Sequence, residues 1–142
     1  LDMIRVEAAL LFYPYDMDER NTPWEMGLGY TVSKKKEAHY RGKEGLMAAR
    51  GHEKVKTFGV VADHHSAVDM DTEIFIQGKL VGKVTQPMFS KLTDQSLAMV
   101  QIEPDYAKEQ IDVELKSPNV SCSGVTHSLP FLDPEKRKRS AN

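Results

Sequence analysis

The feature that most restricts the fold of this chain is a series of short apolar segments that begins after Gly51. These segments are typical of strands, and Gly, Pro and Asp residues separate them. The predicted strands cover residues 55–62, 72–76, 80–85, 96–103, 111–116 and 120–127. Gln77-Gly78-Lys79 predicts a hairpin turn between the second and the third. This pattern favours a small antiparallel β-barrel or sandwich across roughly residues 52–131.

The segment before Gly51 predicts helices instead. Apolar residues recur at helical spacing over residues 1–12, and Pro14 is expected to end this helix at about Tyr13. A second helix is predicted over residues 42–50, with Gly51 as its terminating residue. The fold class is therefore predicted as mainly β with α, a barrel of about six strands preceded by a short helical segment.

Two shorter signals lie between these helices. Thr22, Pro23 and Glu25 have the spacing of a helix cap, in which a hydroxyl and a carboxylate each accept from the other residue's backbone N–H. Residues 30–32 predict a short strand. The pattern of the first helix is already under way at Leu1, without a capping residue or a lead-in, so we expect that sequence is missing upstream.

Composition excludes several classes of function. The apolar fraction of 40% and the charged fraction of 28% are those of a soluble globular domain, and a net charge of -2 gives no drive toward nucleic acid or an anionic membrane. No apolar run approaches the roughly 20 residues of a membrane span. The single cysteine, Cys122, cannot form an internal disulfide, which fits a reducing, cytoplasmic location.

Three pairs of short motifs occur in a recognisable order and spacing. They are R-V-E-A at residues 5–8 with D-M-D-E at 16–19, T-P-W-E-M-G-L-G-Y at 22–30 with R-G-K-E-G-L at 41–46, and G-K-V-T-Q-P at 82–87 with S-L-A-M-V at 96–100. Together they resemble the aminomethyltransferase family, which includes the T-protein of the glycine cleavage system, in its C-terminal region.

This resemblance implies an enzyme of three subdomains around tetrahydrofolate. Residues 1–51 would be the end of the folate-binding domain, residues 52–131 the C-terminal barrel and residues 132–142 a basic tail. The catalytic residues would lie upstream of Leu1, so none is expected in this chain, and the isolated chain is expected to be inactive and to bind folate weakly. The implied partners are folate and a small methylated or aminomethylated substrate, with a lipoyl carrier protein if the parent is of the glycine-cleavage type.

One departure from the family pattern leaves alternatives open. Leu1 stands where glycine-cleavage members carry an Arg that helps to hold the ligand, and an aliphatic residue cannot replace a guanidinium. This departure favours a folate-dependent S-, N- or O-demethylase, such as a relative of dimethylsulfoniopropionate demethylase. A non-catalytic folate-binding or assembly module is the third possibility.

Four residues are candidates for folate contacts. Arg137, Lys138 and Arg139 lie where the resemblance places a cation near the carboxylates of the folate tail, although a solvated terminal run is the alternative. Glu7 could face the folate cleft, but it and Arg5 could instead hold their helix against its neighbours by hydrogen bonds.

Three further signals have structural alternatives, and no metal is expected. His64, His65, Asp69 and Asp71 have the chemistry of metal ligands, yet their spacing fits no ligand pattern and favours a polar loop. Trp24 could stack on a ligand or anchor its turn. Cys122 has no neighbouring base in the sequence and is expected to be an inert packing residue.

Overall fold

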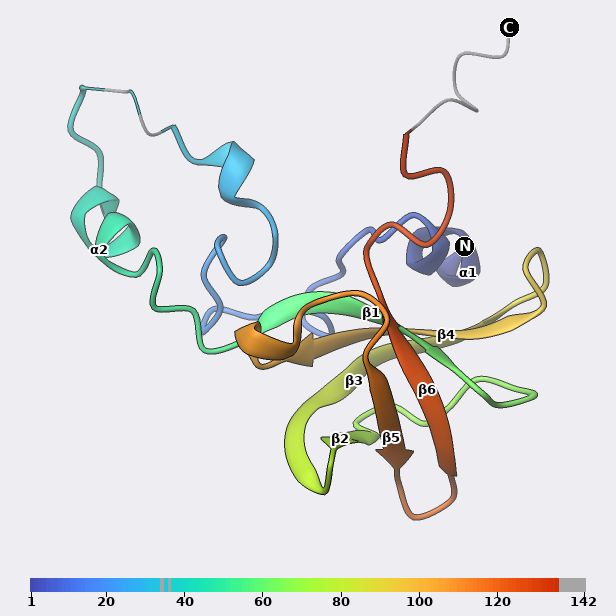
Figure 1. The fold of residues 1–142 in the computed structure, drawn as a ribbon. Helices are drawn as coiled ribbons and strands as arrows, with labels where there is room; N and C mark the ends of the chain where they lie inside the picture. Colours follow the sequence, from blue (N-terminus) through green and yellow to red (C-terminus); the bar gives the residue numbers. More distant parts are fainter. Residues whose placement is uncertain (34, 36, 136–142) are drawn as a thin grey trace, which may run out of the picture.

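The computed structural model describes residues 1–33, 35 and 37–135, and its main body is a closed antiparallel barrel (Figure 1). The strands are β1 (Lys56–Ala62), β2 (Glu73–Ile76), β3 (Lys79–Ser90), β4 (Gln95–Ile102), β5 (Asp112–Lys116) and β6 (Ser121–His127). They close in the order β1-β4-β3-β2-β5-β6. The predicted mainly-β fold with a barrel of six strands is confirmed.

Alternation along the strands separates the two faces of the barrel wall. Val60, Val100 and Ile102 belong to the buried cluster inside the barrel. Their neighbours Leu97 and Met99 face outward and are nevertheless fully buried, because helix α1 (Asp2–Glu7) covers them with Val6. Strand β4 is thus buried on both faces, which explains its nearly continuous apolar sequence.

Strand β3 is longer than its sequence pattern predicts. It continues to Ser90 through Pro87, which pairs with Ala98 of β4. A register shift between Val84 and Gln86 precedes the proline, which has no N–H to donate. At the other end of β3, Gln77 and Gly78 both have positive φ, so the predicted hairpin turn between β2 and β3 is confirmed.

The predicted helix over residues 1–12 is wrong in length, because α1 ends at Glu7. Ala9 adopts a left-handed φ of 55°, and the Arg5 guanidinium donates hydrogen bonds to Leu10 O at 3.0 Å and to Asp16 Oδ2 at 2.8 Å. These contacts turn the chain away from the helical path before Pro14 is reached. Tertiary contacts therefore override the local helical pattern.

The remaining short elements agree less well with the elements that the sequence predicts. The predicted strand at residues 30–32 is wrong: Gly29–Thr31 forms a 3-10 helix, η1, and the closed barrel leaves no free edge for another strand. Helix α2 (Lys43–Ala48) lies within the predicted 42–50, and Gly51 has the positive φ of a terminating glycine. A second 3-10 helix, η2 (Pro104–Tyr106), follows β4. None of the described helices is long and apolar enough to cross a membrane.

Candidate functional site

An open pocket of about 630 Å³ lies between the 22–33 segment and the end of α2. It is lined by Trp24, Gly29, Tyr30, Val32, Ser33, Lys35 and Arg50. None of these described lining residues is acidic, and the Tyr30 side chain is largely exposed at 84%. Aromatic faces beside two cations suit a flat ligand that carries negative charge. We refer to these residues as the aromatic–cationic pocket.

Trp24 is the structural centre of this pocket. Its indole Nε1 donates a hydrogen bond of 2.7 Å to Leu46 O, which ties the turn to α2. The Arg50 guanidinium lies 5.6 Å from the indole centroid, within cation–π range. A Cβ at Gly29 would lie 2.8 Å from Trp24 Cε3, so only glycine permits this packing. Trp24 therefore anchors its turn, as one of its two interpretations predicted.

Glu25 connects the pocket to the barrel. Its Oε2 accepts from Thr22 N at 2.8 Å, while Thr22 Oγ1 accepts from Glu25 N at 3.3 Å, so the predicted reciprocal bonds are present, but they close a turn and the expected helix does not form. Its Oε1 accepts from Lys54 N at 3.0 Å, just before β1. Burial acts to raise the pKa of Glu25, but these hydrogen bonds outweigh it and hold the pKa below its usual value.

The Glu25→Gln variant should be less stable than the wild type at neutral pH, and the difference should disappear in acid. The pKa of Glu25 is lower in the folded than in the unfolded protein, so the ionised side chain stabilises the fold. This stabilisation is fully present above the ordinary pKa of 4.5 and is lost as the pH falls through the folded-state pKa. Urea unfolding from about pH 3 to about pH 7, a range that spans the ordinary carboxyl pKa, measures this difference. An equal difference in stability at both ends of that range would contradict the ionised cap.

Glu7 lies at the junction between α1 and the barrel. Its side chain is buried, with the residue 6% exposed, and its Oε1 accepts a hydrogen bond of 2.5 Å from Ser90 Oγ. Arg5 on the same helix donates to Gln86 Oε1 at 2.8 Å. Both residues thus bond α1 to β3, the arrangement expected if they hold the helix in place. The other three predicted folate contacts, Arg137, Lys138 and Arg139, lie outside the described residues.

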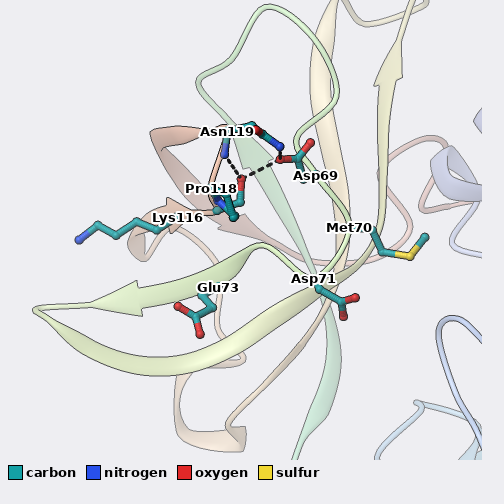
Figure 2. Close-up of a pocket in the computed structure, with 8 residues that line it drawn as sticks. Asp69, Met70, Asp71, Glu73, Lys116, Pro118 and Asn119 are labelled. Atoms are coloured by element: carbon teal, nitrogen blue, oxygen red, sulfur yellow. Dashed lines mark hydrogen bonds between the residues drawn. The ribbon is translucent and has the colours of Figure 1, made fainter.

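The four candidate metal ligands have separate partners. The centroids of the His64 and His65 rings lie 4.7 Å apart, and His64 Nδ1 is hydrogen-bonded to Ser66 O. Asp71 pairs with a lysine instead: its Oδ1 lies 3.2 Å from Lys83 Nζ. Asp69 Oδ2 accepts from Ser117 and Asn119 at the edge of a second pocket of about 650 Å³ (Figure 2). Across residues 1–33, 35 and 37–135, no group of three or more His, Cys, Asp or Glu side chains could hold a metal ion.

The second pocket differs from the aromatic–cationic pocket in its charge. Asp69, Asp71 and Glu73 line it, with Lys116 as its basic residue (Figure 2). Such a surface disfavours an anionic ligand.

Elsewhere in the barrel, burial and the nearby Asp63 raise the pKa of the Cys122 thiol, which favours its protonated, less reactive form, as predicted.

Tyr30, Lys35 and Arg50 are not among the site residues that the sequence predicts. The sequence pattern places Tyr30 in a strand and Arg50 at the end of a helix. The one signal that pointed to this place was Trp24, for which stacking on a ligand was one interpretation. Arg50 lies beside Trp24 because Trp24 bonds to α2, a contact between distant residues that no local pattern contains.

Comparisons with known proteins match both the sequence and the fold. The family model described as "Glycine cleavage T-protein C-terminal barrel domain" matches residues 54–133. The chain is 38% identical, over 99% of its length, to the heme-dependent oxidative N-demethylase gamma subunit of Ectopseudomonas mendocina, and 33% identical, over 92%, to an aminomethyltransferase of Thermosipho melanesiensis. It spans 39% and 35% of the lengths of these two relatives.

A solved structure has the same fold. The glycine cleavage system aminomethyltransferase T of Bartonella henselae superposes with a TM-score of 0.85 at 22% sequence identity. The superposition covers 93% of this chain and 38% of that one. In each of these comparisons, more than half of the relative lies outside the matched region.

Proposed function

Because this chain belongs to the family of the glycine cleavage T-protein C-terminal barrel domain, we propose that it forms the C-terminal region of a tetrahydrofolate-dependent one-carbon transferase, the barrel together with the segment before it. The observation that carries the proposal is the aromatic–cationic pocket in a chain of this family. Its aromatic and cationic side chains suit a ligand such as folate, which combines an aromatic ring with carboxylates. Tetrahydrofolate, when bound, supplies the nitrogen that accepts the one-carbon unit.

The proposed role of this chain is to bind and enclose folate, while residues outside this chain carry out the transfer. One-carbon transfer needs a carboxylate placed against the folate nitrogens and a cleft that excludes water. The described lining of the aromatic–cationic pocket contains no carboxylate. We therefore place the reacting groups in a region of the kind that the relatives carry outside the matched part. A cytoplasmic location is part of the same proposal.

Titration with 5-formyltetrahydrofolate, a stable folate, tests this proposal. Trp24 is the only tryptophan, so its indole N–H gives a single resolved NMR signal. We expect this signal to move with a Kd on the order of millimolar, equivalent to about -4 kcal/mol. Arg50→Ala should weaken binding by about tenfold, because it removes one charge-assisted contact worth roughly 1.5 kcal/mol.

Two controls complete the titration. Lys116→Ala, in the acidic pocket, should leave the Kd unchanged. Replacing Arg137, Lys138 and Arg139 together by alanine tests the tail: loss of binding there but not in Arg50→Ala would move the site to the tail. A Trp24 signal that does not respond to saturating folate would overturn the pocket assignment.

A demethylase is the second candidate, and one observation favours it. Identity to the N-demethylase gamma subunit is higher and extends over more of the chain than identity to the Thermosipho aminomethyltransferase. The two functions share the folate acceptor and differ in the donor. Assays of the whole gene product with tetrahydrofolate distinguish them: an N-methylated amine would serve a demethylase, whereas an aminomethyl group on a lipoyl carrier protein would serve an aminomethyltransferase.

A further inference from the structure

Two neighbouring residues, Trp24 and Glu25, bond to different parts of the chain. Trp24 Nε1 donates to Leu46 O at 2.7 Å and ties its turn to α2, which lies to one side of the barrel in Figure 1. Glu25 bonds to the chain that enters β1: its Oε1 accepts from Lys54 N at 3.0 Å, and its backbone oxygen accepts from Thr57 N at 2.9 Å. The Trp24–Glu25 turn thus joins the aromatic–cationic pocket to the barrel.

The carboxylate of Glu25 is buried at this junction, with the residue 6% exposed, and both of its oxygens accept hydrogen bonds. Oε2 accepts from the backbone N–H of Thr22 at 2.8 Å and from its hydroxyl at 3.1 Å, while Oε1 accepts from Lys54 N. One residue further along, Thr57 Oγ1 donates to Met26 Sδ at 3.4 Å. Hydrogen bonds to a charged acceptor are stronger than neutral ones, so those of Glu25 fix the position of the turn.

Glu25 does not belong to the described lining of the aromatic–cationic pocket, and neither do Lys54 and Thr57. An effect of Glu25 on a ligand in this pocket therefore has to act through Trp24, its neighbour in sequence. Trp24 in turn supports Arg50, whose guanidinium lies 5.6 Å from the indole centroid. A displaced turn would move the aromatic and the cationic side of the pocket together.

We propose that Glu25 is the positioning residue of the aromatic–cationic pocket: it holds the turn on the chain that enters β1 and so sets the affinity for a ligand that it does not touch. This inference rests on the proposed function, in which the ligand is a folate. The apparent Kd of a pocket rises as the fraction of molecules in which it is formed falls. Because such coupling is reciprocal, a bound ligand should also affect the hydrogen bonds at Lys54 and Thr57.

NMR titration with 5-formyltetrahydrofolate at neutral pH tests the effect on affinity. Glu25→Ala should raise the Kd at least about tenfold, the factor expected if the formed pocket becomes about ten times rarer. Glu25→Gln, which keeps one acceptor oxygen, should give a smaller increase, and it serves as the test where Glu25→Ala does not fold. A wild-type Kd in a folded Glu25 variant would overturn the proposal.

Two control variants should keep the wild-type Kd. Glu53→Gln changes another carboxylate that accepts from a backbone N–H, that of Gly51 at 3.0 Å, but within its own loop. Gly82→Ala should destabilise the barrel, because the added Cβ would lie 2.4 Å from Gln101 O, yet it leaves the Trp24–Glu25 turn intact. A Kd raised as much in Gly82→Ala as in Glu25→Ala would mean that Glu25 acts only on overall stability, and would overturn the proposal.

The backbone amide signals of Lys54 and Thr57 give a readout that a merely stabilising residue would not affect. In the wild type both should move with the same Kd as the Trp24 indole signal, although neither residue lines the pocket. They should still move in Arg50→Ala, at higher folate concentration, whereas the response should be lost in Glu25→Ala. Amide signals that stay fixed in the wild type while the Trp24 signal moves would contradict the coupling.

Contacts in the ligand-free protein separate this proposal from the proposed function. NOEs between the Trp24 ring and the Arg50 side chain should be lost in Glu25→Ala and kept in Glu53→Gln and Gly82→Ala. NOEs retained in Glu25→Ala reject the positioning role, whether or not folate binds. A wild-type Trp24 signal that does not respond to folate, together with NOEs that depend on Glu25, rejects the proposed function alone.

Discussion

Replacing Asp16 by alanine should lower the free energy of unfolding by about 3–5 kcal/mol, because it leaves the Arg5 charge without its buried partner. The Asp16 side chain is fully buried and that of Arg5 is 11% exposed, and their charged atoms lie 2.8 Å apart. The carboxylate also accepts from Phe12 N and Thr85 Oγ1. Its removal would therefore leave Phe12 N without this acceptor at the junction between the N-terminal segment and the barrel, while Arg5 keeps Leu10 O and Thr85 Oγ1 keeps Met99 O as acceptors.

Urea unfolding followed by circular dichroism measures this loss. Asp18→Ala is the matched control, since it removes an aspartate two residues away whose partner Arg20 is 85% exposed. Its unfolding midpoint should move far less than that of Asp16→Ala, because Arg20 is solvated although the Asp18 side chain is only 21% exposed. Equal shifts in the two variants would show that burial of the Arg5–Asp16 pair has no special effect. Asp16→Asn, which keeps an acceptor but not the charge, should fall between Asp16→Ala and the wild type.

Replacing Gly82 by alanine should destabilise the barrel by about 1–3 kcal/mol, the usual range for an added group in a closely packed site. An added Cβ would lie 2.4 Å from Gln101 O and 2.9 Å from Ile102 Cα. Both contacts are with the backbone of β4, so no side-chain rotation can relieve them and the two strands must separate locally. Gly82 lies within β3, where the lack of a side chain permits this close approach to β4.

Gly45→Ala provides a control of opposite sign. Gly45 lies in α2, and a Cβ there would meet no atom within 4 Å. Alanine should stabilise this helix by up to about 1 kcal/mol through its higher helix propensity. Urea unfolding midpoints that move in opposite directions for the two glycines would support the close approach of β3 to β4. A neutral Gly82→Ala variant would contradict it.

The sequence alone contained the fold class and the family. Strand propensity and turn residues after Gly51 predicted all six strands, although β3 extends beyond its predicted end, because alternation and turn chemistry are properties of adjacent residues. The ordered motifs predicted the T-protein family, and the match of the family model to residues 54–133 confirms it. The reciprocal bonds of Thr22 and Glu25 were also predicted, since a cap spans only four residues.

Only the tertiary structure determined where the helices end and which residues form the pocket. The first helix stops at Glu7 because Arg5 bonds to Asp16, eleven residues away, and to Gln86 on β3. Tyr30 and Arg50 share a pocket because Trp24 bonds to α2 across 22 residues. Local patterns predict which side chains become buried. Contacts between residues far apart in the sequence form only when the chain has folded and brought them together, so no local pattern predicts them.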